Sequence, residues 1–585
     1  MSTAIVTGQP VPGSPLEGDL RALGFDVRLA PDAADARAAL ATVPGDQRVA
    51  VVDAGFVGHV HALRLGLTDP RFAASAVPGA VTVQPTARQA LNRAVAENGV
   101  APDAVAKSLE AAGTDVHRPV LGELVAAVPH DPQARNEARQ RVAAVDDEAI
   151  RLRTAVKARD GFFTTYCISP YSRYIARWCA RRGLTPNQVT TASLLTALVA
   201  AGCAATGTRP GFVAAGLLLL FSFVLDCTDG QLARYSLQYS TLGAWLDATF
   251  DRAKEYAYYA GLALGAANAT GDDVWALALG AMVLQTCRHV VDFSFNEANH
   301  DADANTSPTA ALSDKLDSVG WTVWVRRMIV LPIGERWALI AIFTALTTPR
   351  ITFWVLLVGC ALAACYTTAG RVLRSLTRKA RRTDRAAAAL AELADSGPLA
   401  QAIARVGKSA AAPVVAALGG AAVVAVSAFT DFGSAWPVLA AAVYCVTSGL
   451  AVARPLKGAL DWLVPPIFRA SEYLTVLVLA ARADVNGALP AAFGLVAAVA
   501  YHHYDTVYRI RGDAGAPPHW LVRAIGGHEG RTLVVTAVAA TLTSTDFTVA
   551  LTALAVLVAL VVLAESIRFW VSAGAPAVHD EGEPA

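Results

Sequence analysis

Four aspartates between residues 226 and 251 are the side chains in this sequence that are best suited to chemistry. Asp226 and Asp229 are three residues apart. Asp247 and Asp251 are four residues apart, so a helix through either pair would present both of its carboxylates to one side. If the two helices face each other, all four carboxylates come together.

Apolar sequence surrounds both pairs. The run from Gly211 to Leu225 leads directly into the first pair, and the second pair opens a largely apolar segment that continues to Ala267. Ionised carboxylates at a membrane boundary are costly unless an opposite charge compensates them. Helix capping or ion pairing is one form of compensation, and a divalent metal is the simplest. Because every ligand would be an oxygen, Mg²⁺ or Mn²⁺ is the expected cofactor, with one or two ions bound and two the expected number.

Small residues and one arginine lie between the two pairs. Gly230 follows Asp229 directly, and Ala233 and Arg234 come one turn later. Small side chains let a ligand approach the backbone, and a guanidinium suits phosphate. The full pattern reads Asp226-x2-Asp229-Gly230-x2-Ala233-Arg234-x8-Gly243-x3-Asp247-x3-Asp251. At every fixed position it resembles the signature of the CDP-alcohol phosphotransferase (CDP-alcohol phosphatidyltransferase) family.

The resemblance implies a membrane enzyme of phospholipid or related phosphodiester biosynthesis. Its donor would be a CDP-alcohol, its acceptor the hydroxyl of a polyol phosphate or a lipid, and CMP would be released. By the same resemblance, Asp226, Asp229 and Asp247 would hold the metal ions. Asp251 would reach the second ion and act as the general base that takes the proton of the acceptor hydroxyl.

The resemblance also implies roles for the remaining positions of the pattern. Gly230, Ala233 and Gly243 would line the CDP site, and Arg234 would either steady the acidic cluster or touch phosphate. A homodimer is a further expectation for the assembly.

A second segment carries the same resemblance. Residues 185–190 read TPNQVT, which is similar to the PN-x-x-T start of the first membrane helix in this family. By that resemblance, Asn187 and Thr190 would help to hold the nucleotide. Lys157 and Arg173 would be the phosphate contacts.

The stretch before that segment mixes aromatic residues with arginines. Residues 161–182 contain six aromatic residues and four arginines. This combination is typical of an amphipathic helix that lies on the cytoplasmic leaflet among membrane lipids. An ordinary solvated basic face is the alternative interpretation.

The composition is that of a membrane protein, since 54% of the 585 residues are hydrophobic and only 17% are charged. Lys and Arg gather on one side of the apolar segments, which predicts that this side, with the aspartates, is cytoplasmic. We therefore predict a multi-pass protein of the cell membrane, with a six-helix phosphotransferase bundle and the interfacial helix in residues 151–375. Its membrane segments are expected near 188–207, 211–232, 242–267, 272–292, 335–349 and 351–370.

Residues 1–150 have a different character, with 13 Lys and Arg against 18 Asp and Glu. The acidic balance argues against nucleic acid as a partner. The first residues lack a basic region followed by an apolar core, so we expect a soluble domain that stays in the cytoplasm. The apolar pattern predicts an α/β domain with a βαβαβ start and a parallel sheet. Its strands are expected at 3–7, 26–30 and 48–53, and its helices at 16–23 and 33–41.

The placement of this domain resembles fusions in which a nucleotidyltransferase domain precedes a CDP-alcohol phosphotransferase. The loop from Gly8 to Gly18, and Asp53 at the end of a strand, lie where open α/β sheets bind ligands. The glycines nevertheless match neither G-x-G-x-x-G nor a P-loop, and the basic residue and later lysine of the nucleotidyltransferase signature are missing. The prediction is an inactive, structural or regulatory nucleotidyltransferase-like domain, with an active cytidylyltransferase as the alternative.

The sequence after the predicted bundle gives fewer indications of function. Seven Lys and Arg in residues 371–385 predict contact with anionic head groups, and residues 376–407 are interpreted as a basic, helical linker. Residues 408–585 form a C-terminal membrane domain of unknown function, without a second copy of the aspartate pattern. About six further membrane helices are expected near 411–430, 436–453, 467–482, 487–504, 531–545 and 547–568.

Three polar sets flank these C-terminal segments. A metal or phosphate site is one interpretation of them, and ion pairing at the membrane surface is favoured, because charges beside membrane segments are routinely paired. The sets are Asp461, Arg469 and Glu472; His502, His503, Asp505, Arg509 and Arg511; and His528, Glu529 and Arg531.

The polar loop 292–317 carries Glu297, His300, Asp301 and Asp303, for which a flexible loop is favoured over a second metal site. The eight cysteines contain no C-x-x-C pair, so we expect free thiols rather than zinc ligands or disulfides. A function of another class stays open, namely a transporter or a catalytically silent membrane scaffold that retains a metal or nucleotide site.

Overall fold

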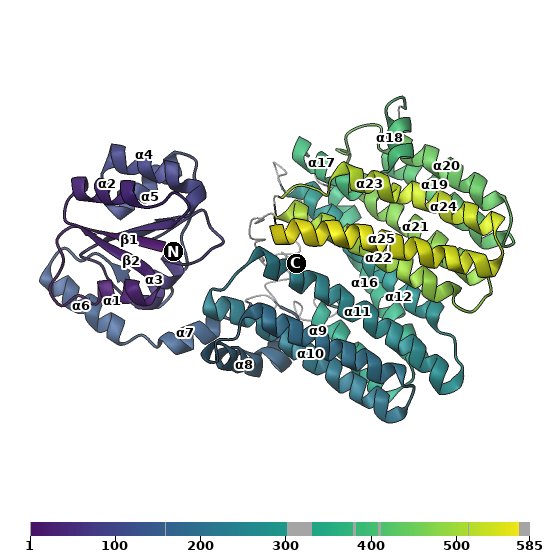
Figure 1. Cartoon of the computed structure of the whole chain (residues 1–585), viewed down its shortest axis with the longest axis horizontal. Coiled ribbons are helices and arrows are strands. Elements are labelled where there is room, and N and C mark those ends of the chain that lie inside the picture. Colours follow the sequence, from purple (N-terminus) through teal and green to yellow (C-terminus); the bar gives the residue numbers. More distant parts are fainter. Residues whose placement is uncertain are drawn as a thin grey trace.

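The computed structural model describes residues 2–157, 160–300, 330–377, 382–407, 411–512 and 514–572. The chain forms an α/β domain at its N-terminus and a much larger helical body beside it (Figure 1). Helices α6 (Pro132–Ala143) and α7 (Asp147–Thr154) lead from the first part to the second.

The first strands and helices of the N-terminal domain form where the apolar pattern predicts them. Strands β1 (Ser2–Thr7), β2 (Phe25–Ala30) and β3 (Arg48–Asp53) run parallel, with β1 in the middle. Helices α1 (Leu16–Ala22) and α2 (Ala33–Thr42) connect them. The predicted βαβαβ start is therefore confirmed.

The expectation of a parallel sheet is wrong for the rest of the domain, because a tight hairpin enters the sheet. Strands β5 (Ala74–Val77) and β6 (Ala80–Val83) are joined by Pro78 and Gly79 and pair antiparallel. Gly79 has φ +78°, a conformation that favours glycine in two-residue turns. Because β6 also pairs antiparallel with β3, the sheet is mixed, with the order β2-β1-β3-β6-β5-β7. The other elements are β4 (Val57–Gly58), α3 (Val60–Leu67), α4 (Arg88–Asn98), α5 (Pro102–Ala111), β7 (Val116–His117) and β8 (Ala126–Ala127).

Helices also occupy the positions expected for the bundle. Helix α8 (Ser169–Arg181) covers the predicted interfacial segment, and its side chains Tyr171, Tyr174 and Trp178 are exposed. Six longer helices follow at the predicted membrane segments. They are α9 (Pro186–Ala205), α10 (Arg209–Ser236), α11 (Thr241–Thr270), α12 (Trp275–Asn299), α15 (Ile333–Leu346) and α16 (Pro349–Thr377).

The described elements of the C-terminal part are all helices. Helices α17 (Asp384–Leu393) and α18 (Pro398–Ala404) fall in the segment interpreted as a linker, yet they are packed, since Leu390, Leu393 and Ala394 are buried. The helices that follow are α19 (Ala412–Phe429), α20 (Trp436–Ala451), α21 (Val464–Arg482), α22 (Ala488–Arg511), α23 (His519–Ile525), α24 (Gly527–Thr541) and α25 (Ser544–Ser572).

Among the described residues, six helical segments are long and apolar enough to cross a membrane, and the chain is a multi-pass membrane protein. The expected number of about twelve spans is not established by this criterion. Helices α11, α12 and α22 are long but more polar, and α15, α20 and α24 are shorter. The six segments are Pro186–Ala205, Arg209–Ser236, Pro349–Thr377, Ala412–Phe429, Asp461–Arg482 and Ser544–Val571.

One continuous apolar core joins the bundle to the C-terminal helices. The same cluster of buried side chains extends from Ile168 to Val562. Helix α12 packs against α21 and α22, and α11 packs against α22 and α25. At the start of α11, the Trp245 ring stacks on Trp570 of α25, with 6.2 Å between their centroids. The helix that carries Asp247 and Asp251 is thereby fixed by the C-terminal part of the chain.

Truncating Trp570 should loosen this contact. The side chain is 3% exposed and its Nε1 donates to Asp505 Oδ1 at 2.7 Å, so Trp570→Ala leaves a cavity and removes one of the donors to that carboxylate. We expect a loss of roughly 3–5 kcal/mol, measured as a marked fall in the melting temperature of the detergent-purified protein. Trp436→Ala is the matched control, because Trp436 is 65% exposed. Equal melting temperatures for the two variants would contradict the packing described.

Candidate active site

Three of the four aspartates converge. Asp226 and Asp229 lie on α10 and Asp247 lies on α11, and one oxygen from each lies within 4.8 Å of the others. This is the only group of three or more potential metal ligands found in the described parts of the chain. The helical spacing thus brings the predicted carboxylates together as a set of oxygen ligands.

Helix α9 packs against both of the helices that carry the aspartates, α10 and α11. Its start is a capping box, in which Thr185 Oγ1 accepts from the backbone N–H of Gln188 and the Gln188 side chain accepts from the N–H of Thr185. Pro186 occupies the first turn, where a missing N–H costs nothing. The TPNQ sequence therefore fixes where α9 begins.

Two residues predicted to hold the nucleotide, Asn187 and Thr190, lie in the first turns of α9. Asn187 Oδ1 lies against the start of α11, so close that a Cβ at Gly243 would be 2.6 Å from it. Only glycine permits that approach. The Thr190 hydroxyl donates to the Pro186 carbonyl at 3.0 Å and also lies in hydrogen-bond contact with Asp229. Asn187 and Thr190 therefore border the acidic cluster.

A buried lysine completes the cluster. Lys254 on α11 is fully buried, and its Nζ pairs with Asp226 Oδ1 and lies 2.8 Å from Asp251 Oδ1. The same ammonium donates to Ser193 Oγ at 3.2 Å and lies 5.3 Å from the centroid of the Trp337 ring. Asp251 is not one of the three converging aspartates, but it shares the Lys254 ammonium with Asp226 and lies in hydrogen-bond contact with that carboxyl.

The donor set fits a divalent cation. Three carboxylates supply oxygen atoms only, which Mg²⁺ and Mn²⁺ prefer. Asp229 Oδ2 is buried and has no hydrogen-bond partner among the described residues. Lys254 pairs with both Asp226 and Asp251 but carries only one positive charge, so the four carboxylates together still need further positive charge. An ion coordinated by Asp226, Asp229 and Asp247 would meet that need.

The small-residue face of α10 lies open beside the acids. A Cβ at Gly230 would meet only the Arg234 guanidinium, at 3.5 Å. Arg234 is itself anchored, because its Nε donates to the Ala155 carbonyl at 2.6 Å. Ala233 is half-buried on the same stretch. Arg234 is thus fixed near the position where a ligand would approach the backbone.

The two proposed phosphate contacts lie on the chain that leads into the bundle. Arg173 is half-buried on α8, its guanidinium lies 5.2 Å from the Tyr174 ring centroid, and its Nε has no hydrogen-bond partner among the described residues. Lys157 follows α7 and interacts electrostatically with Cys227, which lies next to Asp226.

A second charged layer, absent from the sequence-based prediction, supports α11. Glu255 is 2% exposed and accepts from Arg252 at 2.8 Å and from Tyr259 at 2.7 Å. Arg336 of α15 lies 3.2 Å from the same carboxylate. Lys254 and Glu255 could have been identified from the sequence, because charged residues within a membrane segment tend to be functional or paired.

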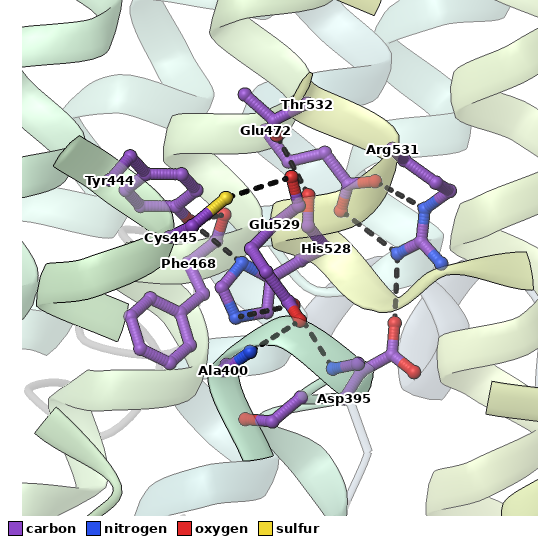
Figure 2. Close-up of polar contacts among 12 residues, drawn as sticks. Asp395, Ala400, Tyr444, Cys445, Phe468, Glu472, His528, Glu529, Arg531 and Thr532 are labelled. Carbon is purple, nitrogen blue, oxygen red and sulfur yellow. Dashed lines mark hydrogen bonds and ion pairs between the residues drawn. The ribbon is translucent and has the colours of Figure 1, made fainter. Parts of the chain in front are cut away.

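Part of each of the three polar sets of the C-terminal part lies in one buried network, of which Figure 2 shows the portion around Glu472, Glu529 and Arg531. Arg531 donates to Asp395 Oδ2 at 2.8 Å and to Glu472 Oε1 at 2.5 Å. Arg469 lies 2.7 Å from Asp395 Oδ2, and His502 lies 3.2 Å from Asp395 Oδ1. Ion pairing, the favoured interpretation, is found for Arg469, Glu472 and Arg531, but these side chains are buried between helices.

Glu529 links this network to α18. Its carboxylate accepts from the backbone N–H groups of Gly397 and Ala400, both at 3.0 Å, and so caps the start of that helix (Figure 2). The His528 ring stacks on Phe468 with 4.0 Å between centroids, and its Nδ1 lies 2.8 Å from Tyr444 Oη. These contacts give the set a structural role. A separate group joins Asp505, Arg509 and Glu565.

Two other candidates contribute little to the site. Glu297 and His300 lie near Arg385, whereas Asp301 and Asp303 fall outside the described residues. In the N-terminal domain, the cavity beside the Gly8–Gly18 loop measures about 80 Å³, far below the ~300 Å³ at which small-molecule pockets begin. The eight cysteines are free thiols, as expected.

Comparison with known families identifies the region built around the acids. Residues 183–365 match the family described as CDP-alcohol phosphatidyltransferase. This region is a CDP-alcohol phosphatidyltransferase domain. Residues 384–585 match a different family, one of unknown function (DUF5941), so that match begins inside the segment interpreted as a linker.

Curated relatives agree with this assignment over part of their length. The chain is 32% identical over 125 residues to a bifunctional IPC transferase and DIPP synthase of Thermococcus kodakarensis, covering 21% of this chain and 27% of the relative. It is 35% identical over 91 residues to the archaetidylinositol phosphate synthase of Pyrococcus horikoshii, covering 16% and 47%. It is 32% identical over 112 residues to the phosphatidylinositol phosphate synthase of Streptomyces avermitilis, covering 19% and 43%. The chain therefore spans less than half the length of each.

Lys254 should govern how strongly the phosphatidyltransferase domain depends on metal. Lys254→Met removes a buried ammonium that pairs with two half-buried carboxylates, so the metal-free protein should lose roughly 3–5 kcal/mol of stability. A divalent cation should restore more stability to this variant than to the wild type. The measurement is the rise in melting temperature on titration with Mg²⁺ or Mn²⁺.

Lys457→Met is the matched control, because Lys457 pairs with Asp384 at the surface and is 42% exposed. It should leave the metal response unchanged. If Lys254→Met and the wild type respond equally to metal, Lys254 does not share the compensation of the acids.

Proposed function

We propose that the CDP-alcohol phosphatidyltransferase domain transfers a phospho-alcohol group from a CDP-alcohol to a hydroxyl acceptor and releases CMP. The observation that carries this proposal is the convergence of Asp226, Asp229 and Asp247 within 4.8 Å, with Asp251 one turn further along α11. The family match and the relatives named as synthases support the same reaction class.

In the proposed reaction, each residue of the site has its own role. Asp251 takes the proton of the acceptor hydroxyl, whose oxygen then attacks the phosphorus that carries the alcohol. The bond from that phosphorus to the bridging oxygen breaks, and CMP leaves with the electron pair. Asp226, Asp229 and Asp247 would hold the divalent cation, which neutralises the diphosphate and the charge that develops on the leaving group. Lys254 fixes Asp251 in position through their 2.8 Å contact.

Small groups of α10 and α11 would receive the donor. The open face at Gly230 leaves room for the CDP group, and the anchored Arg234 guanidinium lies beside it. Asn187 and Thr190 border the same space from α9. Arg173 and Lys157 would contact phosphate from the segment that leads into the bundle.

Two of the relatives are named archaetidylinositol phosphate synthase and phosphatidylinositol phosphate synthase, so inositol phosphate is the first acceptor to test. The distribution of basic residues supports an orientation in which the acids and the N-terminal domain face the cytoplasm from the cell membrane. Soluble acceptors and CDP-linked donors are available on that side.

A catalytically silent scaffold is the second candidate. It is favoured by Lys254, which already compensates Asp226 and Asp251. The same assay separates the two functions, since only the enzyme releases CMP and only in the presence of metal.

Asp251→Asn should abolish turnover while leaving the protein folded. An amide cannot accept the proton at neutral pH, so CMP release should fall by roughly 10²–10⁴-fold. The measurement is CMP release from a panel of CDP-alcohols with inositol phosphate, glycerol phosphate or lipid acceptors, with products identified by mass spectrometry.

Asp272→Asn is the matched control, because Asp272 follows the far end of α11, where it pairs with Arg350. It should retain wild-type turnover. Chelation of divalent cations should stop CMP release in both the wild type and this control. Full CMP release by Asp251→Asn would defeat the proposed role of that residue.

A further inference from the structure

A cleft of about 470 Å³ separates the N-terminal domain from the end of α10. One wall is formed by the end of α1 and by α3, another by α7, and the floor by Ser236 and Leu237. We call it the interdomain cleft. Its volume falls within the ~300–1,000 Å³ typical of small-molecule sites.

Polar atoms in the interdomain cleft lack partners. His61 of α3 is 4% exposed, yet neither of its ring nitrogens has a hydrogen-bond partner among the described residues. The same holds, within those residues, for Arg151 Nε and Asp147 Oδ1 of α7. Asp147 Oδ1 lies 3.9 Å from His59 Nδ1 and 4.0 Å from His61 Nδ1, and Asp147 Oδ2 lies 3.8 Å from Arg151 Nη1, all too long for hydrogen bonds. Buried polar groups normally have partners, so these groups are available to form hydrogen bonds with a ligand in the cleft.

The charge of the cleft selects the kind of ligand. Arg64 and Arg151 both line it, and Asp147 is the acid that faces them. Burial lowers the pKa of Arg64, and the neighbouring Arg151 lowers it further. Burial also lowers the pKa of His61 to about 4; Asp147 opposes this shift, whereas Arg64, Arg151 and His59 add to it. At neutral pH, two guanidinium groups therefore face one carboxylate and a neutral imidazole, which favours an anion.

The guanidinium groups are already held in place for such a ligand. Arg64 Nη2 donates to the Ser236 carbonyl at 2.6 Å. Arg151 donates to the Tyr235 carbonyl at 3.4 Å and lies 4.1 Å from the centroid of the Tyr235 ring. Phosphate is well matched to a pair of anchored arginines. The Asp147 carboxylate and the uncharged His61 ring suit hydroxyl groups.

We propose that the interdomain cleft binds a small soluble phosphate monoester of a polyhydroxy compound. Its phosphate lies between Arg64 and Arg151, and its hydroxyl groups meet Asp147 and His61. This site lies outside the acidic cluster and uses none of its residues. Because Ser236 and Leu237 end α10, the ligand ties the N-terminal domain to the turn that leads into α11.

The test is a calorimetric titration of the full chain in detergent. Glycerol 3-phosphate and an inositol phosphate should bind saturably, inorganic phosphate more weakly, and glycerol not at all. Arg151→Gln should weaken binding by about tenfold or more, because a charge-assisted contact to phosphate is lost. Arg153→Gln is the matched control, since Arg153 lies on the same helix with its side chain 65% exposed and should leave the affinity unchanged.

Two further variants separate this site from the acidic cluster and from a folding defect. Ala22→Trp fills the cleft from an exposed position without removing a charge, and it should abolish binding. Asp247→Asn alters the acidic cluster and should leave binding intact.

Four results would overturn the proposal: no saturable binding of any monoester, equal losses for Arg151→Gln and Arg153→Gln, binding that survives Ala22→Trp but not Asp247→Asn, or binding confined to vesicles that contain phosphatidic acid. The last would assign the cleft to a lipid head group instead of a soluble ligand. None of these results depends on turnover, so they are independent of the outcome of the CMP assay.

Discussion

The placement of four carboxylates among apolar helices, with Asp229 buried and the other three half-buried, is the constraint on which this structure depends. Removing an ionised carboxylate from water is costly, so each one needs a nearby positive charge. Lys254 supplies that charge to Asp226 and Asp251, and a divalent cation at Asp226, Asp229 and Asp247 would supply the rest. Because two sources of charge share one site, metal affinity and the stability of α10 and α11 are linked.

The same constraint shapes the C-terminal helices. Burial alone would raise the pKa of Asp395, but Arg469 and Arg531 hold it well below its usual range. Together with Glu472, these residues form a network with two acids and two bases, all of them buried. Replacing such a network by apolar residues often leaves stability unchanged, whereas removing one partner is strongly destabilising. We therefore interpret the network as a device that fixes how α18, α21 and α24 meet, which in turn fixes the surface that α22 and α25 present to α11.

Sequence reasoning located most helices, because apolar length and caps such as Thr185 are local signals. It located the acids for the same reason, since their spacing lies within two helices. It missed Lys254, although this residue is three positions from Asp251, because no other residue of the pattern pointed to a cation there. It could not predict that Asp395 meets Arg531, because 136 residues separate them and only tertiary packing brings them together. The mixed sheet was missed because the strands after residue 53 were not interpreted, even though Pro78 and Gly79 mark a hairpin.

The N-terminal domain and the C-terminal helices contact, from two sides, the helices α10 and α11 that carry the aspartates. A metal ion requires its ligand oxygens to be placed within a few tenths of an ångström. The turn that joins α10 to α11 is short, and in it Leu237 adopts φ +51°, an unfavourable conformation for a residue with a side chain. The N-terminal domain contacts that turn through Arg64 at Ser236 and through Arg71, whose guanidinium lies 4.0 Å from the Tyr239 ring centroid. On α11, Trp245 is two residues from Asp247 and is fixed by Trp570. Both flanking domains can therefore affect the acidic cluster, because a shift of either contact changes the distance between the acids of α10 and those of α11.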